Sequence, residues 1–223
     1  MLDPETYFNE TEFADNLEPR CACVLVLDTS GSMKGLPIQK LNEGYKLFIN
    51  TLKKDNLSSL RIELCVLACG GGVKLVQDFT TVDRVSVKPF LSDGDTPMGE
   101  AITTAVAKVT ERKKVYRTNG IQYYRPWVFM ITDGEPTDEW KRAVTLIHEQ
   151  EKGRHLSFFA VGVEGANMHI LNQISVRKVV QLRGLNFAGM FEWLSGSLSA
   201  VAESKPDEAT PIRSVDGWAT APA

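Results

Sequence analysis

The segment Asp28-Thr29-Ser30-Gly31-Ser32 places one carboxylate and two hydroxyls at alternate positions of the chain. The apolar residues 23–27 come directly before it and are typical of a buried strand. In an open α/β sheet, ligands bind where the strands end and the loops begin. Oxygen ligands of this kind suit a hard divalent cation such as Mg²⁺, so the segment predicts part of a metal site.

Thr96 and Asp133 are two further oxygen-bearing residues in suitable places. Thr96 stands at the start of a helix predicted over residues 97–114, and Asp133 directly follows a strand predicted over 127–132. If this strand and the strand before Asp28 are neighbours in a parallel sheet, the two carboxylates emerge at the same edge. We expect Thr96 to come down onto the same point.

Each of these residues also has a plainer interpretation. Thr96 before Pro97 has the form of a helix N-cap followed by proline at the first helical position. Asp133-Gly134 is an ordinary turn signal, and the two serines can bond loop backbone.

Hydrophobic periodicity predicts alternating strands and helices along most of the chain. The predicted strands cover residues 22–28, 61–69, 73–79, 127–132, 156–163 and 179–182. The predicted helices cover residues 37–54, 97–114, 138–152, 167–176 and 185–202, with Asp138 as the cap of the third. This order indicates an α/β fold: a doubly wound, mostly parallel central sheet flanked by helices on both faces.

Two turn signals add detail to this expected fold. The three glycines at 70–72 favour a tight reversal, which makes residues 73–79 an antiparallel edge strand. Asn119-Gly120 lies between β-prone residues and predicts a hairpin within residues 115–125.

We expect one domain at residues 21–203, an N-terminal extension at 1–20 and a flexible C-terminal tail at 204–223. Hydrophobic residues make up 43% of the chain and charged residues 24%, which allows a sizeable core. The formal net charge of -3 argues against nucleic acid as the partner. No apolar run reaches the about 18 residues that span a bilayer, and residues 1–20 lack the apolar core of a secretory signal. These features predict a cytoplasmic protein.

The four cysteines, Cys21, Cys23, Cys65 and Cys69, have spacings that raise the question of a zinc site. In a parallel pair of strands, however, Cys69 aligns with the far end of the first strand, too far from Cys21 to share one ion. We therefore expect buried free thiols.

The set Asp28, Ser30, Ser32, Thr96 and Asp133 resembles the metal-ion-dependent adhesion site (MIDAS) of the von Willebrand factor type A (VWA) domain. That family carries Asp-x-Ser-x-Ser, a distant Thr and a later Asp, usually followed by Gly. The resemblance covers about residues 22–202. It implies a Mg²⁺ ion, with Mn²⁺ or Ca²⁺ as substitutes, bound directly by the three hydroxyls.

The same resemblance implies that Asp28 and Asp133 act largely through bound water and by orienting the hydroxyls. The cation then keeps an open position for an Asp or Glu carboxylate of another protein, so the expected function is non-enzymatic protein binding. The expected rim of contact residues is Met33, Lys34, Leu36, Asp95, Met98 and Glu135, although both methionines can equally pack under the loops. Asp95 departs from the family, which often has a small residue there, and makes the rim more acidic.

Residues 119–127, Asn-Gly-Ile-Gln-Tyr-Tyr-Arg-Pro-Trp, are similar to the bacterial tellurite-resistance VWA proteins (TerY-like). This closer resemblance implies a bacterial stress-response complex, in which a protein kinase and a phosphatase accompany the VWA protein.

Two other functions stay open. A Mg²⁺-dependent phosphatase or phosphotransferase of haloacid-dehalogenase type also places an Asp after its first strand, but it normally carries a second Asp where this chain has Ser30. The other open function is that of a VWA scaffold, which binds partners without metal.

Overall fold

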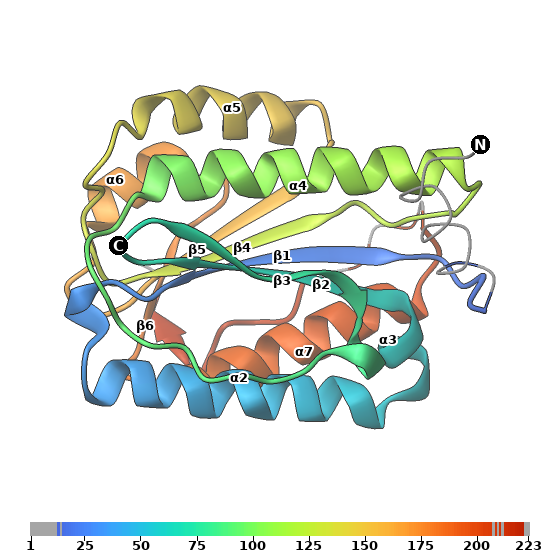
Figure 1. Ribbon diagram of the computed structural model, residues 1–223, viewed down its shortest axis with the longest axis horizontal. Coiled ribbons are helices and arrows are strands. Elements are labelled where there is room, and N and C mark those ends of the chain that lie inside the picture. The colour runs from blue at the N-terminus through green and yellow to red at the C-terminus, as the bar shows by residue number, and fades with distance from the viewer. Residues whose placement is uncertain (1–12, 14, 207, 209, 211, 221–223) are drawn as a thin grey trace, which may run out of the picture.

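The computed structural model describes residues 13, 15–206, 208, 210 and 212–220, and Figure 1 shows their arrangement. Within these residues, seven strands form one sheet in the order β3-β2-β1-β4-β5-β6-β7. The strands are β1 (Cys21–Asp28), β2 (Ile62–Cys69), β3 (Val73–Thr81), β4 (Trp127–Thr132), β5 (Ser157–Gly162), β6 (Val180–Leu182) and β7 (Ala219–Thr220). The helices are α2 (Leu36–Lys54), α3 (Asn56–Arg61), α4 (Met98–Thr118), α5 (Lys141–Lys152), α6 (Met168–Ile174) and α7 (Phe187–Glu203), with short 3-10 helices η1 (Gly31–Met33) and η2 (Val82–Arg84).

The sheet is mostly parallel, as the sequence predicts. Strands β2, β1, β4, β5 and β6 run in one direction. Strand β3 pairs antiparallel with β2 at one edge, which confirms the predicted edge strand. Strand β7, which the sequence analysis did not predict, pairs antiparallel with β6 at the other edge.

Helices cover both faces of the sheet, with α4, α5 and α6 on one side and α2, α3 and α7 on the other (Figure 1). Strand β1 contributes to both cores because its side chains alternate: Leu25 and Leu27 pack towards α2 and α7, whereas Val24 and Val26 pack towards α4 and α5. This double burial explains the continuous apolar run in the sequence. Among the described helices, none combines the length and the apolar character needed to cross a bilayer.

The predicted hairpin at residues 115–125 is wrong. Helix α4 continues to Thr118, and Asn119 caps its end by donating its backbone N–H to Val115 O at 3.1 Å. Gly120 follows with φ +66°, so the Asn-Gly pair ends a helix here instead of turning a strand. Helix α3 was also not predicted; its six residues follow the N-cap Asp55, whose side chain accepts a hydrogen bond from Ser58 N at 2.6 Å.

Within the predicted C-terminal tail at 204–223, described residues near the end of the chain pack against the domain. Trp218 is 4% exposed and its ring centroid lies 5.3 Å from that of Trp193 on α7. Burial of this tryptophan brings Ala219 and Thr220 onto β6 as strand β7. Most of the predicted N-terminal extension, residues 1–12 and 14, lies outside the described residues, and the domain limits stay a prediction.

The four cysteines are free and buried, which confirms the prediction for them. Cys21 pairs with Ile62 at the amino end of strands β1 and β2, whereas Cys69 pairs with Asp28 at the carboxyl end. Burial raises the pKa of the Cys21 thiol to about 12, with a smaller effect of Glu63, so this thiol stays protonated at neutral pH.

Candidate functional site

The carboxylate of Asp28, at the end of β1, accepts hydrogen bonds from neutral groups. Its Oδ1 accepts from Ser30 N at 2.9 Å. Its Oδ2 accepts from the Thr132 hydroxyl at 2.5 Å and from Asp133 N at 3.3 Å. Asp28 is 1% exposed, so these bonds fix the carboxylate between the ends of β1 and β4.

Ser30, Ser32 and Asp133 form a chain of hydrogen bonds across the two loops. The Ser30 and Ser32 hydroxyl oxygens lie 2.9 Å apart, and the Ser32 hydroxyl donates to Asp133 Oδ1 at 2.8 Å. Ser30 is buried, Asp133 is half-buried and Ser32 is exposed. The site therefore opens to solvent on the side of Ser32.

Thr96 reaches the same point from the start of α4. Its carbonyl accepts hydrogen bonds from Met98 N at 2.8 Å and Thr137 N at 3.0 Å, and its side chain is buried. A Cβ built on Gly134 would lie 2.8 Å from Thr96 Oγ1 and 3.6 Å from Asp28 Oδ2. The absence of a side chain at Gly134 thus leaves space between these two oxygens. The structure brings all five predicted ligand residues together.

The plainer interpretation of Thr96 as a helix cap does not hold. Pro97 occupies the N-cap position of α4, and no side-chain capping bond is made there. The cap comes instead from Asp138, whose carboxylate accepts from Gly99 N at 2.9 Å and from Glu100 N at 2.8 Å. Asp138 was predicted to cap the following helix, which begins three residues later at Lys141.

Backbone bonds between separate loops hold the first ligand segment, a feature that the sequence analysis missed. Thr29 N donates to Cys69 O, and Thr29 O accepts from Asp93 N, both at 2.8 Å. Gly31 N donates to Gly94 O at 2.8 Å. Gly94 has φ +61°, and a Cβ on it would lie 2.4 Å from Gly71 Cα, so only glycine allows this approach.

The two carboxylates share the site without a compensating positive charge. No ion pair within the described part of the chain involves Asp28 or Asp133. Burial raises the pKa of Asp133 above its usual range and the nearby Asp28 raises it further, while the bond from Ser32 lowers it. The site therefore carries negative charge that a bound cation would offset.

The donor set fits a hard divalent cation. Among the described residues, no three His, Cys, Asp or Glu side chains are grouped as a metal site would require. The set here contains two carboxylates and three hydroxyls, all oxygen donors, around the space left by Gly134. Such donors suit Mg²⁺ or Ca²⁺ rather than a metal that prefers sulfur or nitrogen.

The expected rim divides into exposed and buried residues. Lys34, Leu36, Asp95 and Glu135 are exposed, and Leu36 reaches 56%. Met33 and Met98 are fully buried, which corrects their place on the contact rim: they pack into the two cores beneath the loops.

Among the described residues, Thr132 supplies the one side-chain hydrogen bond to Asp28, and the sequence analysis did not single it out. Its hydroxyl donates to Asp28 Oδ2 and accepts from Gly134 N at 3.2 Å. A hydroxyl residue at the last position of a buried strand, directly before Asp133, was the available signal.

The comparisons with known proteins agree with this fold. The sequence model of the von Willebrand factor type A domain matches residues 23–183, and the chain belongs to that family. Domains of this family are typically protein-interaction modules. A search of curated proteins found no match.

Solved structures of low sequence identity share the fold. Proximal thread matrix protein 1 from the mussel byssus is 14% identical with a TM-score of 0.56, covering 82% of this chain and 49% of its own. The pilus adhesin SpaC from Lactobacillus rhamnosus GG, in its open conformation, is 13% identical with a TM-score of 0.64, and the match covers 82% of this chain and 31% of SpaC. The conserved hypothetical protein BatB from Bacteroides thetaiotaomicron is 18% identical with a TM-score of 0.56, and the match covers 82% of this chain and 100% of BatB. The chain thus spans about half of the mussel protein.

Proposed function

We propose that the chain is a non-enzymatic, metal-dependent protein-binding module. Ser30, Ser32 and Thr96 would hold a Mg²⁺ ion, with Asp28 and Asp133 orienting the hydroxyls and offsetting its charge. Once bound, the cation supplies an electron-poor coordination position for an Asp or Glu carboxylate of a partner. The observation that carries this proposal is the convergence of three hydroxyls and two carboxylates, with no positive side chain of the described residues forming an ion pair with either carboxylate.

The hydrogen bonds support the division of roles. Asp28 already accepts three hydrogen bonds from its surroundings, so it is fixed in place as an orienting group. The Ser32 hydroxyl, by contrast, is exposed and bonded only to neighbouring site residues. Neutral hydroxyl ligands leave more of the charge of the cation for a partner anion than carboxylate ligands would.

The likeness to other VWA proteins gives further support. A structure of proximal thread matrix protein 1, 15% identical to this chain with a TM-score of 0.55, has a zinc-occupied MIDAS motif. The resemblance of residues 119–127 to tellurite-resistance VWA proteins suggests a bacterial, cytoplasmic stress-response complex. A kinase or phosphatase of the same system is then the expected partner.

The phosphatase alternative is less well supported by the site. At the position where such enzymes normally carry their second Asp, Ser30 offers a hydroxyl bonded to Ser32. If the alternative were right, the full chain with Mg²⁺ would hydrolyse p-nitrophenyl phosphate, and Asp28→Asn would abolish that turnover.

The test is capture of partners from native lysate on the immobilised full chain, with three arms. The native chain with Mg²⁺ should retain a partner, while the native chain with EDTA and the Thr96→Val variant with Mg²⁺ should not. Valine keeps the shape of threonine but lacks the hydroxyl. Equal capture in all three arms would instead support the metal-independent scaffold.

A further inference from the structure

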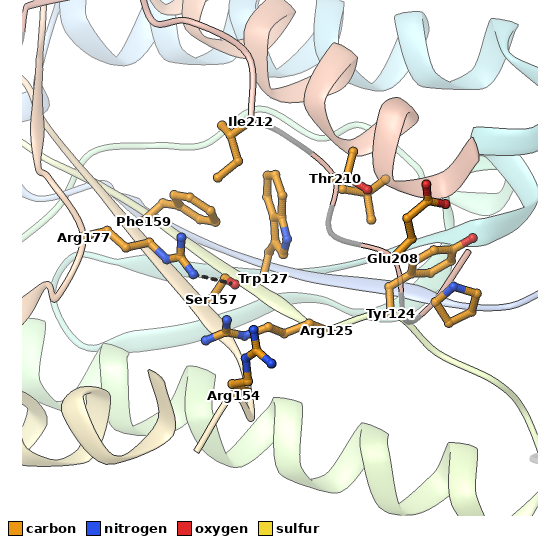
Figure 2. A pocket seen from close by; sticks show the side chains of 12 residues that line it. Tyr124, Arg125, Trp127, Arg154, Ser157, Phe159, Arg177, Glu208, Thr210 and Ile212 are labelled. Atoms are coloured by element: carbon orange, nitrogen blue, oxygen red, sulfur yellow. Dashed lines mark hydrogen bonds between the residues drawn. The ribbon is translucent and has the colours of Figure 1, made fainter. Parts of the chain in front are cut away.

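A cavity of about 340 Å³ lies at the opposite end of the sheet from the candidate metal site. It opens at the amino ends of β4 and β5, whose first residues, Trp127 and Ser157, pair with each other. Figure 2 shows three arginines around it, Arg125, Arg154 and Arg177. The volume falls within the range of small-molecule binding sites.

Two of the arginines are held rigidly by one carboxylate. Arg125 Nη2 lies 2.6 Å from Glu151 Oε2, and Arg177 Nε lies 2.7 Å from Glu151 Oε1. Arg177 Nη2 also donates to the Ser157 hydroxyl at 3.1 Å (Figure 2). Each guanidinium keeps its Nη1 outside these bonds. Because both arginines are fixed, their remaining N–H groups are already ordered for a ligand.

Arg154 differs from the other two. It is exposed, and among the described residues its side chain makes no hydrogen bond or ion pair. Its backbone has φ +55°, an unusual conformation for a residue other than glycine, and this turns the chain at the end of α5. The positive charges of Arg177 and Arg154 both contribute to lowering the pKa of Arg125, after burial as the main cause.

The cavity combines this positive charge with an apolar wall. Three arginines line the cavity, and the Glu151 carboxylate pairs with two of them, Arg125 and Arg177. Glu208, which also lines the cavity, lies beside Tyr124, away from Arg177 (Figure 2). The rings of Trp127 and Phe159 have centroids 4.6 Å apart and line the same space, with Ile212 above them (Figure 2). The guanidinium carbon Cζ of Arg177 lies over the Phe159 ring, 5.0 Å from its centroid, as in a cation–π contact.

We propose that this cavity binds a small phosphate monoester that carries a flat ring, such as a nucleoside monophosphate. The phosphate would contact Arg154 and the Nη1 groups of Arg125 and Arg177, since guanidinium groups bind phosphate oxygens through paired N–H donors. The ring would lie against Trp127 and Phe159. This inference does not depend on the candidate metal site.

The test is calorimetric titration of the full chain with phenyl phosphate and with adenosine monophosphate, with EDTA in every sample so that no metal binds the phosphate. We expect saturable binding of one molecule per chain by both probes. Inorganic phosphate, which lacks the ring, should bind more weakly than either. Benzoate, which has a ring but only one negative charge, should bind at least about tenfold more weakly than phenyl phosphate.

Arg154→Gln should weaken binding of phenyl phosphate about tenfold, because it removes one charge-assisted contact while leaving the bonds to Glu151 in place. Arg142→Gln is the matched control, because Arg142 lies on α5 and its side chain is 95% exposed. This variant should bind phenyl phosphate as tightly as the native chain. The proposal is overturned if neither probe shows saturable binding up to about 10 mM, a very weak affinity. It is also overturned if Arg154→Gln binds as tightly as the native chain.

Discussion

Buried carboxylates at the two ends of the central sheet have very different partners. At the amino end, Glu63 on β2 lies 2.9 Å from Arg20 Nε and 2.7 Å from Arg112 Nε, and it also accepts a hydrogen bond from the Tyr116 hydroxyl. Glu151 is likewise paired with two arginines. At the carboxyl end, the buried Asp28 and the half-buried Asp133 accept hydrogen bonds from neutral donors alone among the described residues.

This contrast separates carboxylates that stabilise the fold from carboxylates kept for binding. A buried charge without a partner costs free energy of folding, and a fold normally supplies the opposite charge itself. At the amino end the fold supplies it twice, since Glu63 and Glu151 are each paired with two arginines. At the carboxyl end the opposite charge has to come from outside the chain, which is the property expected of a cation site.

Glu63→Ala should have the largest effect on stability. It removes the negative charge from between two buried guanidiniums, which costs about 3–5 kcal/mol when one partner of a buried pair is lost. Urea unfolding followed by circular dichroism measures this cost. The control is Glu43→Ala, which breaks an exposed pair with Lys40 and should change stability by less than about 0.5 kcal/mol. A similar small change for both variants would remove the contrast between the two ends.

Asp133→Asn should weaken Mg²⁺ binding while leaving the stability of the metal-free chain nearly unchanged. The amide oxygen can still accept from Ser32, and the repulsion from Asp28 disappears, so unfolding in EDTA should show no loss beyond about 1 kcal/mol. Mg²⁺ should bind at least about tenfold more weakly, because a group that orients the ligands has lost its charge. Calorimetric titration measures the affinity. A large loss of stability in EDTA would mean that Asp133 is structural, like Glu63.

Gly134→Ala should reduce Mg²⁺ affinity about tenfold by filling the space between Thr96 Oγ1 and Asp28 Oδ2. Its effect on stability in EDTA should stay within about 1 kcal/mol, because an added methyl also restricts the unfolded chain. The same titration and urea experiments separate the two quantities. Native affinity in this variant would show that the space beside Gly134 is not used by the ion.

Asp95→Asn should have the smallest effect. Asp95 is exposed near the site, so its charge acts through solvent and should change Mg²⁺ affinity only about twofold. Repeating the titration at high salt should abolish this difference. A tenfold effect that persists in salt would place Asp95 among the direct ligands.

The sequence predicted the parallel core well because each buried strand is a continuous apolar run with a clear end. Strand β4 was predicted to the residue, between Pro126 and Asp133. Short or ambiguous signals failed. Asn119-Gly120 serves equally well to end a helix or to turn a hairpin, and only the burial of Tyr116 within α4 decides between them.

The candidate site was predicted as a set of residues, while its supports were not. The alternation of Asp28, Ser30 and Ser32 is visible in the sequence, whereas the contact between Gly71 and Gly94 depends on how two distant loops meet. In the same way, no local pattern shows that Asp138 caps α4, a helix that starts 40 residues earlier.

The central claim is that the site containing Thr96 binds Mg²⁺. The most direct test is to titrate Mg²⁺ into the full chain after it has been stripped with EDTA and dialysed, and to do the same with the Thr96→Val variant. We predict one Mg²⁺ site per chain, a melting temperature several degrees higher in saturating Mg²⁺, and loss of both in the variant, which should remain folded in EDTA. A native chain that takes up no Mg²⁺, or a Thr96→Val variant that binds it equally well, would contradict the account.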